Sequence, residues 1–319
     1  MKTFYWLMKR EFWEHRGGFL WTPVITGGIF LVLNIMGIVT AEVLGSRHGI
    51  TVGGTNMQTL LANADAKDLT QIGAALDVAL VSATGLITMV MGFVVLFYCL
   101  GSLYDDRRDR SILFWKSLPI SSTSTVLSKL ASALVLAPVI AIAAGTAVGL
   151  LQLLLFAVVL SLHGLNVWQM LGLSHPFRAV AALIASVPLY ALWALPAAGW
   201  LMFCSAAARS RPFLWAIAVP AMTGLMITWF GIMGLFNLPA GWFWQNIVAR
   251  CLLSIFPGSS LVMGRHAMSA MADSDSPLSV IDPAHAYTLL ATPSLWIGVA
   301  AGAALIVGAI WFRRWRDDS

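Results

Sequence analysis

The sequence contains six long apolar stretches that are separated by polar segments. These apolar stretches limit what the chain can fold into. They are Phe19–Val43 (which tolerates Glu42 near its end), Ala79–Leu103, Leu130–Leu162, Ala179–Ser205, Phe213–Phe236 and Ser294–Phe312. A helix needs about 20 apolar residues to cross the hydrocarbon core of a bilayer. A spanning segment must also satisfy its backbone hydrogen bonds internally. The sequence therefore predicts an all-α integral membrane protein with six transmembrane helices.

The composition supports lipid as the main solvent. Of 319 residues, 59% are hydrophobic and only 10% are charged, whereas soluble domains are about 45–50% apolar and about 25% charged. We expect one transmembrane domain over residues 19–312, preceded by a cytoplasmic segment, 1–18, and followed by a cytoplasmic tail, 313–319. The three cysteines are far apart, so they form neither a metal-ligand spacing nor a disulfide framework.

The basic residues predict the orientation, because cytoplasmic segments of membrane proteins carry an excess of Lys and Arg. With the N-terminus inside, fourteen of the 19 Lys and Arg residues fall on the inner side and five on the outer side. The outer five are Arg47, Lys67, Arg178, Arg250 and Arg265. The asymmetry predicts a multi-pass membrane protein with both termini in the cytoplasm. Since the basic residues flank apolar spans, nucleic acid is not an expected partner and membrane lipid is.

Two further segments are predicted to lie at the membrane surface. Residues 1–18 place apolar and basic side chains on different faces of a helix, which is typical of an interfacial helix; the alternative is an irregular basic tail. Gly17-Gly18 would end this helix before the first span. The short apolar stretch Asn246–Met263 carries Arg250 and Pro257, so we interpret it as re-entrant or interfacial.

Motifs for catalysis are missing from the sequence. No Walker A, H-E-x-x-H or G-x-S-x-G pattern occurs, and the six histidines are isolated in loops or at span ends. The spans carry no ionisable residue near their middle, whereas ion-coupled carriers normally keep one there. We therefore predict no catalytic, cofactor or metal site in this chain, and an energy source on another protein.

The segment Tyr104–Leu130 concentrates charge between two apolar spans. Asp105, Asp106 and Asp109 favour the N-terminal end of a short helix, where the helix dipole is positive. An apolar face follows at Ile112, Leu113 and Trp115–Leu118, Pro119 stops the helix, and a Ser or Thr of the following "ISSTST" can cap the third span. Such a cytoplasmic helix is suited to a groove on another protein; the alternative is a basic anchor without a partner.

In this segment the sequence resembles the type-2 ABC transporter permease family. The resemblance lies in the pattern of Asp106, Arg107, Asp109, Arg110, Ile112, Leu113, Ser117, Leu118, Pro119, Ile120, Ser121, Leu127, Lys129 and Leu130. It implies six transmembrane helices, an N-terminal interfacial helix, cytoplasmic termini and a coupling helix between the second and third spans. It also implies a homodimer in a bacterial-type inner membrane, bound to two ATP-binding cassette ATPase subunits, which would hold ATP and Mg.

The resemblance further implies which residues contact the partners. The ATPase-coupling residues would be Asp106, Arg107, Asp109, Arg110, Leu113, Phe114, Leu118 and Pro119. The first, second and fifth spans would line the contact between two copies. We expect small residues of Gly85–Gly92 to allow close helix approach there.

These features predict a permease subunit that exports an amphiphilic, lipid-like or peptide substrate and has no enzymatic activity of its own. Two other functions are compatible with the sequence: a membrane-embedded enzyme and an envelope-assembly scaffold. In either case the working surface would be the outer loop Asn237–Pro293.

Overall fold

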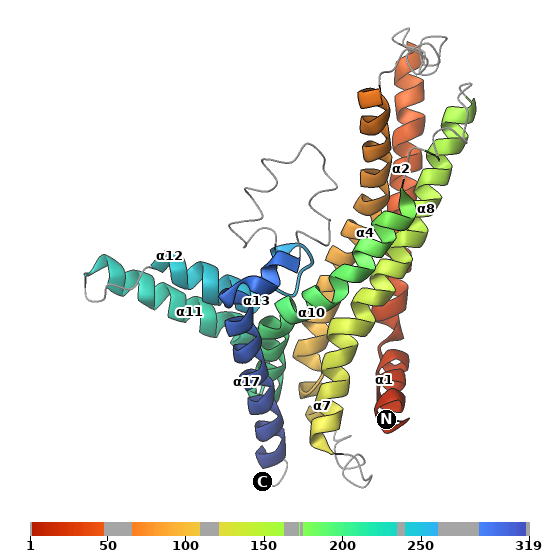
Figure 1. Ribbon diagram of the computed structural model, residues 1–319. Helices are drawn as coiled ribbons and strands as arrows, with labels where there is room; N and C mark the ends of the chain where they lie inside the picture. The colour runs from red at the N-terminus through yellow and green to blue at the C-terminus, as the bar shows by residue number, and fades with distance from the viewer. Residues whose placement is uncertain are drawn as a thin grey trace.

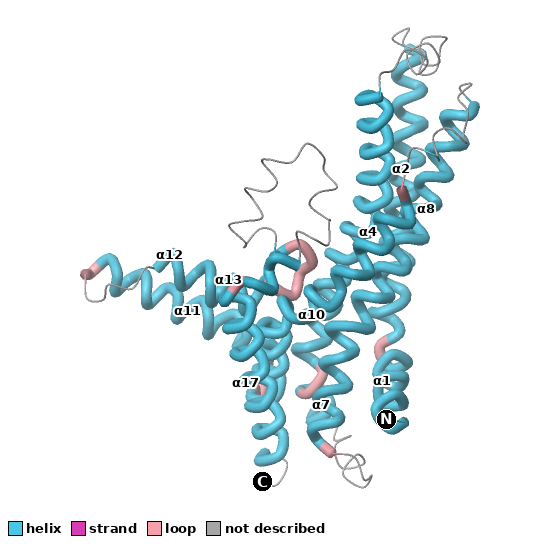
Figure 2. Tube along the Cα trace, viewed as in Figure 1, coloured by secondary structure: helices cyan, strands magenta, loops and turns pink. Residues whose placement is uncertain are grey.

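A computed structural model of the chain describes residues 2–47, 66–108, 121–162, 172, 175–234, 240–260 and 287–316. These parts are almost entirely helical, and no strand occurs among them (Figure 2). The all-α class predicted from the sequence is therefore confirmed for the described residues.

The helices follow one another in chain order. They are α1 (Lys2–Glu14), a π-helical turn η1 (Gly17–Trp21), α2 (Thr22–Arg47), α4 (Ala66–Gly101), α5 (Tyr104–Arg108), α7 (Ser122–Ala131), η2 (Ser132–Leu136), α8 (Ala137–Leu162), α10 (Pro176–Ala207), α11 (Pro212–Ile232), α12 (Ala240–Phe243), η3 (Trp244–Val248), α13 (Ala249–Leu253), η5 (Thr288–Ala291) and α17 (Pro293–Arg316).

Six helices in the described residues are long and apolar enough to cross a membrane, which confirms the six apolar helices predicted. These candidate spans are Gly17–Leu44, Leu76–Arg108, Ser122–Val159, Pro176–Ala207, Pro212–Ile232 and Pro293–Trp315. Each overlaps one predicted stretch. The structure thus has the character of a multi-pass membrane protein.

Figure 1 shows two groups of helices and a projecting arm. In one group α2, α4 and α8 run side by side, and in the other α10 packs against α17. Both ends of the described chain lie at the lower end, near α7. From the lower part of the molecule α11 projects sideways, and α12, η3 and α13 return beside it.

Glycines set how closely the main helix pairs approach. On α8, a Cβ added to Gly145 would lie 2.6 Å from the Cα of Thr84, and one added to Gly149 would lie 2.7 Å from the carbonyl oxygen of Leu80. At the other pair, a Cβ on Gly199 would lie 2.7 Å from the carbonyl oxygen of Gly302. Small residues allow such close backbone contact, which drives helix association in lipid.

The stretch Gly85–Gly92 was expected to mediate contact between two copies. In the structure, part of it packs against another segment of the same chain. A Cβ on Gly92 would lie 2.7 Å from the ring of Phe256, so this glycine already accommodates a neighbour from the same chain. A Cβ on Gly85 would meet nothing within 4 Å. The stretch is therefore not a continuous free surface for close helix approach.

Two helices begin earlier than the apolar stretches from which they were predicted. The second span was expected from Ala79, but α4 begins at Ala66, because a helix can continue beyond the hydrocarbon into polar residues. The third was expected from Leu130, but α7 begins at Ser122. The Oγ of Ser121 accepts a hydrogen bond from the backbone N–H of Ser124 at 3.1 Å, which confirms a serine cap in this segment.

The N-terminal segment is helical as predicted, and it packs on the bundle. Leu7 and Glu11 of α1 are buried, whereas Tyr5, Trp6 and Trp13 are exposed. The buried face contacts α7 and η2. This contact, rather than the predicted apolar stripe alone, fixes α1 to the rest of the chain.

Candidate functional site

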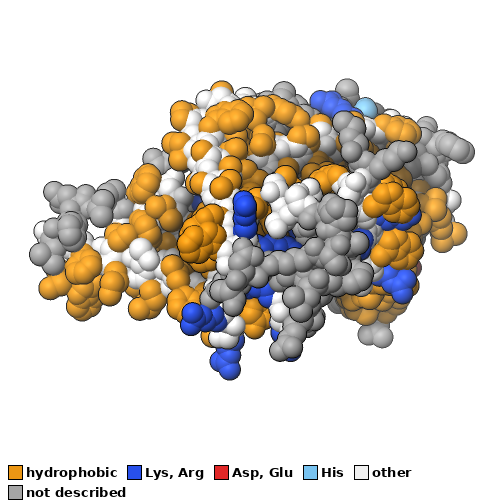
Figure 3. Space-filling model, turned by 90° about the horizontal axis from the view of Figure 1, so that it is seen from below, with side chains coloured by type: hydrophobic (Ala, Val, Ile, Leu, Met, Phe, Trp, Pro, Cys, Tyr) orange, Lys and Arg blue, Asp and Glu red, His pale blue; other side chains and the backbone are white. Residues whose placement is uncertain are grey.

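Parts of six helices meet at one end of the molecule, and we call it the basic end. It contains α1, the last turn of α4 with α5, the start of α7 and the C-terminal ends of α10 and α17. Seen from below, this end shows Lys and Arg side chains at several places on its surface (Figure 3). The structure thus brings together segments that the sequence analysis assigned to the inner side.

Beneath this surface, four charged side chains form a continuous chain of ion pairs. The Lys129 Nζ lies 3.2 Å from Oε1 of Glu11 and 3.4 Å from Oδ1 of Asp106. Nη1 of Arg313 lies 3.5 Å from Oδ2 of the same Asp106. The order Glu11–Lys129–Asp106–Arg313 alternates in sign and balances two negative charges with two positive ones. We call these four residues the charge relay.

The charge relay is removed from solvent. Glu11 is 1% exposed, Lys129 2% and Arg313 7%, and the Asp106 side chain is 11% exposed. The hydroxyl of Tyr98 donates a further hydrogen bond to Oε2 of Glu11 at 2.8 Å. Removing charges from water costs several kcal/mol per ion, roughly, so each charge depends on its neighbours. Loss of one member would leave another buried without compensation.

Ser205 holds the start of the Tyr104–Leu130 segment against α10. Its Oγ accepts hydrogen bonds from the backbone N–H groups of Leu103 and Tyr104 at 3.1 and 3.0 Å. The guanidinium of Arg107 donates to the backbone carbonyls of Ser205 and Ala208, the latter at 3.1 Å. Since these carbonyls lie at the end of α10, Arg107 also compensates the negative end of that helix.

The structure places two of the predicted ATPase-coupling residues. Asp106 and Arg107 lie on α5, and both contact other helices of the same chain. The others, Asp109, Arg110, Leu113, Phe114, Leu118 and Pro119, lie outside the described residues. The described part of the predicted coupling segment is therefore joined directly to α7, α10 and α17, and to α1 through Lys129.

Sequence reasoning missed most of this site. It counted Arg313 only as an inner-side basic residue, used Lys129 for orientation and for the family resemblance, and gave no role to Glu11, Tyr98 or Ser205. One signal was present: Glu11 is one of two acidic residues, with Glu14, on the mainly apolar and basic N-terminal helix. Its partners are far away in sequence, so their pairing follows only from the fold.

A second cationic group lies on the segment interpreted as re-entrant. The guanidinium carbon of Arg250 lies 4.6 Å from the centre of the Trp193 ring, in a cation–π arrangement. Its Nε and one Nη are buried and have no hydrogen-bond partner among the described residues. Burial lowers the pKa of Arg250 and raises that of its neighbour Cys251. These contacts attach α13 to α10, which is compatible with a segment that enters the bundle without crossing it.

Two other kinds of site were considered: a metal site and a working surface on the outer loop. No group of three or more His, Cys, Asp or Glu side chains that could hold a metal ion occurs there. Of the outer loop Asn237–Pro293, which the alternative functions would use, residues 237–239 and 261–286 lie outside the described part.

Comparisons with protein-family models, curated proteins and solved structures found no match to this chain.

Proposed function

We propose that this chain is the permease subunit of an ABC exporter of the type-2 class. In this proposal it has no enzymatic activity of its own and is driven by a separate ATP-binding cassette ATPase, which binds ATP and Mg. The ATPase docks on the 104–130 segment at the cytoplasmic side of a bacterial-type inner membrane. The observation that carries the proposal is the charge relay, because it connects this segment to two other helices, α1 and α17, through buried contacts.

The charge relay suits transmission of force. A helix that only anchors orientation needs exposed basic residues and no buried partners. Here Asp106 is paired with Lys129 of α7 and with Arg313 of α17. A displacement of α5 would therefore move buried charges on two membrane helices at once. We assign docking to the apolar residues of the 109–120 segment, and transmission to Asp106 and Arg107.

A homodimer is part of the proposal, and the distribution of burial supports it. Only 6% of the α2 span and 17% of the α11 span are buried within the chain, against 28–39% for the other four. These are the first and fifth spans, two of the three that the family resemblance assigns to contact between copies. Their exposed apolar surface requires lipid or a second copy as cover.

The test separates docking from transmission. The chain is co-expressed with a candidate ATP-binding cassette ATPase from a neighbouring reading frame and purified by a tag on the chain. The preparation is assayed for bound ATPase and for ATP hydrolysis. Leu118→Ala and Phe114→Ala should reduce co-purification of the ATPase, since truncating a buried interface anchor costs about 2 kcal/mol or more. Arg108→Ala is the control, because Arg108 is exposed and a rim charge contributes less than about 1 kcal/mol.

Variants of the charge relay complete the design. Arg313→Gln should leave the ATPase bound but weaken the coupling of hydrolysis to transport, provided that membrane insertion is normal. If no ATPase co-purifies with the wild-type chain, or if all apolar variants bind and couple like the wild type, the permease function is wrong. An enzymatic activity of the purified chain alone would favour the enzyme alternative instead.

A further inference from the structure

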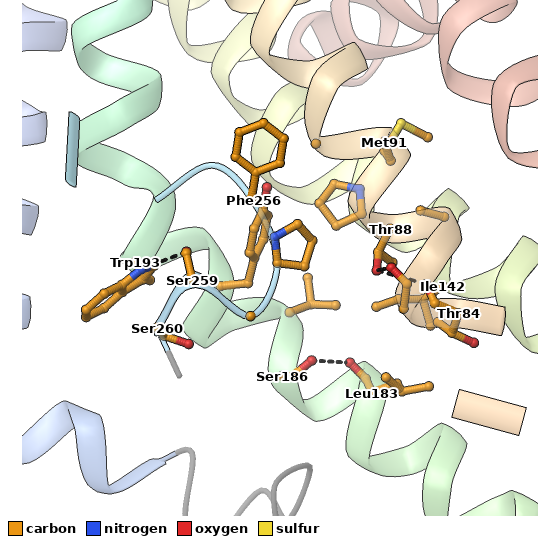
Figure 4. Close-up of a pocket in the computed structure, with 18 of the residues that line it drawn as sticks. Thr84, Thr88, Met91, Ile142, Leu183, Ser186, Trp193, Phe256, Ser259 and Ser260 are labelled. Carbon is orange, nitrogen blue, oxygen red and sulfur yellow. Dashed lines mark hydrogen bonds between the residues drawn. The ribbon is translucent and has the colours of Figure 1, made fainter. Parts of the chain in front are cut away.

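A cavity of about 270 Å³ lies inside a single copy of the chain, between α4, α8, α10 and residues 254–260 (Figure 4). Its walls include Val95 of α4, Ile142 of α8 and Val187 of α10. An apolar cavity of about 150 Å³ is large enough to hold benzene. This one therefore has room for a larger organic group.

The lining is apolar and uncharged. No Lys, Arg, Asp or Glu belongs to it among the described residues, and its polar side chains carry only hydroxyl groups: Thr84, Thr88, Ser186, Tyr190, Ser259 and Ser260, besides the indole N–H of Trp193. The hydroxyl of Thr84, a fully buried residue, has no hydrogen-bond partner in the described part of the chain. The portion of a ligand that enters this cavity must be uncharged and mainly apolar, because a bare charge there would lose its hydration without compensation.

Residues 254–260 form one wall of the cavity, and contacts with α10 and α4 hold them in place. Tyr190 donates a hydrogen bond to the carbonyl of Ile255 at 2.6 Å, and the Trp193 indole donates one to Ser259 at 3.1 Å. The Phe256 ring packs edge-on against Phe93 with centroids 4.7 Å apart. Gly258 has a φ of +80°, which glycine adopts without strain and which turns the chain after Pro257.

The cavity reaches the outer surface of α4. Gly85 belongs to the lining and is also exposed, and its neighbours Leu86 and Met89 are large exposed apolar side chains. In a membrane-spanning helix such a surface faces lipid. A hydrocarbon chain can thus enter sideways from the bilayer without crossing a polar barrier.

We propose that this cavity binds one alkyl chain of a membrane amphiphile, with the re-entrant segment 254–260 as its closing wall. The uncharged walls take the hydrocarbon, and the hydroxyl groups of partly buried lining residues such as Thr88 and Ser186 take an ester, amide or hydroxyl group near it. The head group stays outside the cavity, at the membrane–water interface. That this amphiphile is also the transported substrate is a further step, which rests on the permease function proposed above.

The test uses photolabelling of the purified full-length chain without any ATPase. The probe is a single-chain alkyl maltoside with a diazirine at the end of its chain, and labelled peptides are located by mass spectrometry. We expect saturable labelling of peptides from α4 and α10 that line the cavity. Gly85→Phe should reduce it about tenfold, because Gly85 is exposed where the cavity meets the surface of α4 and an added ring there can cover the entrance. A Cβ at this position meets nothing within 4 Å.

Gly28→Phe on α2 is the matched control. A Cβ at Gly28 also meets nothing within 4 Å, and this residue does not line the cavity. Its labelling should equal that of the wild type. Non-saturable labelling, or equal labelling in the Gly85→Phe and wild-type chains with both folded, would overturn the site.

Adding ATPase and ATP distinguishes two molecules that could supply the bound alkyl chain. Labelling that falls during turnover indicates a transported amphiphile, whereas unchanged labelling indicates a structural membrane lipid; both require the site. Leu118→Ala should leave labelling unchanged, because it affects only the proposed docking. The experiments can therefore exclude the alkyl-chain site without excluding the permease function, and they can exclude the permease function without excluding the site.

Discussion

The ammonium of Lys129 lies 3.2 Å from the carboxylate of Glu11, although the two residues are 118 positions apart in the chain. Both are almost fully buried. Their helices, α1 and α7, are the first helix of the chain and the first helix after the 109–120 segment. This ion pair therefore fixes the N-terminal helix to the base of the third candidate span.

We expect Lys129→Met to destabilise the protein strongly. Breaking a buried ion pair from one side costs about 3–5 kcal/mol, because the remaining charge has lost its compensation. The double variant Glu11→Gln, Lys129→Met should recover part of this loss. The measurement is thermal unfolding in detergent, with Arg10→Met as control, since the Arg10–Glu14 pair at 3.2 Å is largely exposed and contributes less than about 1 kcal/mol. Equal melting temperatures for Lys129→Met and Arg10→Met would contradict the assignment.

The crossing of α10 and α17 should not tolerate even one added methyl group. A Cβ on Gly302 would lie 2.8 Å from the backbone carbonyl carbon and oxygen of Leu195. Gly302→Ala should therefore cost about 1–3 kcal/mol, as overpacking does. Gly28→Ala provides the comparison, because its methyl group meets nothing and Ala favours a helix over Gly by about 1 kcal/mol. The prediction fails if the two variants change the melting temperature in the same direction.

Gln152 should contribute little to stability despite its burial. Its Nε2 donates a hydrogen bond to Oδ1 of Asn34 at 2.8 Å, which links α8 to α2. Such bonds between membrane helices contribute about 0.6 kcal/mol on average. The Oε1 of Gln152 has no partner among the described residues, so Gln152→Leu also removes an unsatisfied acceptor. We expect a change within about 1 kcal/mol by thermal unfolding; a loss like that of Lys129→Met would show that this pair is more important than its geometry indicates.

Cysteine labelling tests whether the basic end faces the cytoplasm. Ser210, between two arginines after α10, is exposed, and Leu162 at the far end of α8 is 81% exposed. An impermeant maleimide should label Ser210→Cys only in inside-out vesicles and Leu162→Cys only in right-side-out ones. Labelling of both from the same side would exclude a membrane crossing between these ends.

The native cysteines should interfere little in that experiment. Cys99 and Cys204 are buried. Burial raises the pKa of Cys251, so less of its thiol is the reactive thiolate at pH 7 than for a free cysteine. Background labelling of the unmodified chain should consequently be slow at pH 7 and should increase as the pH rises toward that raised pKa.

The sequence by itself determined the number of apolar helices and the grouping of basic residues between them. Both depend on local composition: a stretch such as Leu130–Leu162 is apolar enough for lipid whatever its neighbours are. The serine cap before α7 was also predictable, since a cap involves residues only three positions apart. Local signals did not set helix ends such as that of α4, because a helix continues wherever its own hydrogen bonds continue.

Only the tertiary structure decided which residues meet. Glu11, Lys129, Asp106 and Arg313 looked like separate surface charges, and their burial as one relay depends on four helices ending at the same place. Gly92 looked available for a second copy, yet Phe256 occupies the space beside it. The cavity at Gly85 likewise depends on packing among α4, α8, α10 and the 254–260 segment. These contacts join residues far apart in the chain, and the charge balance and close packing that select them are properties of the assembled bundle rather than of any one segment.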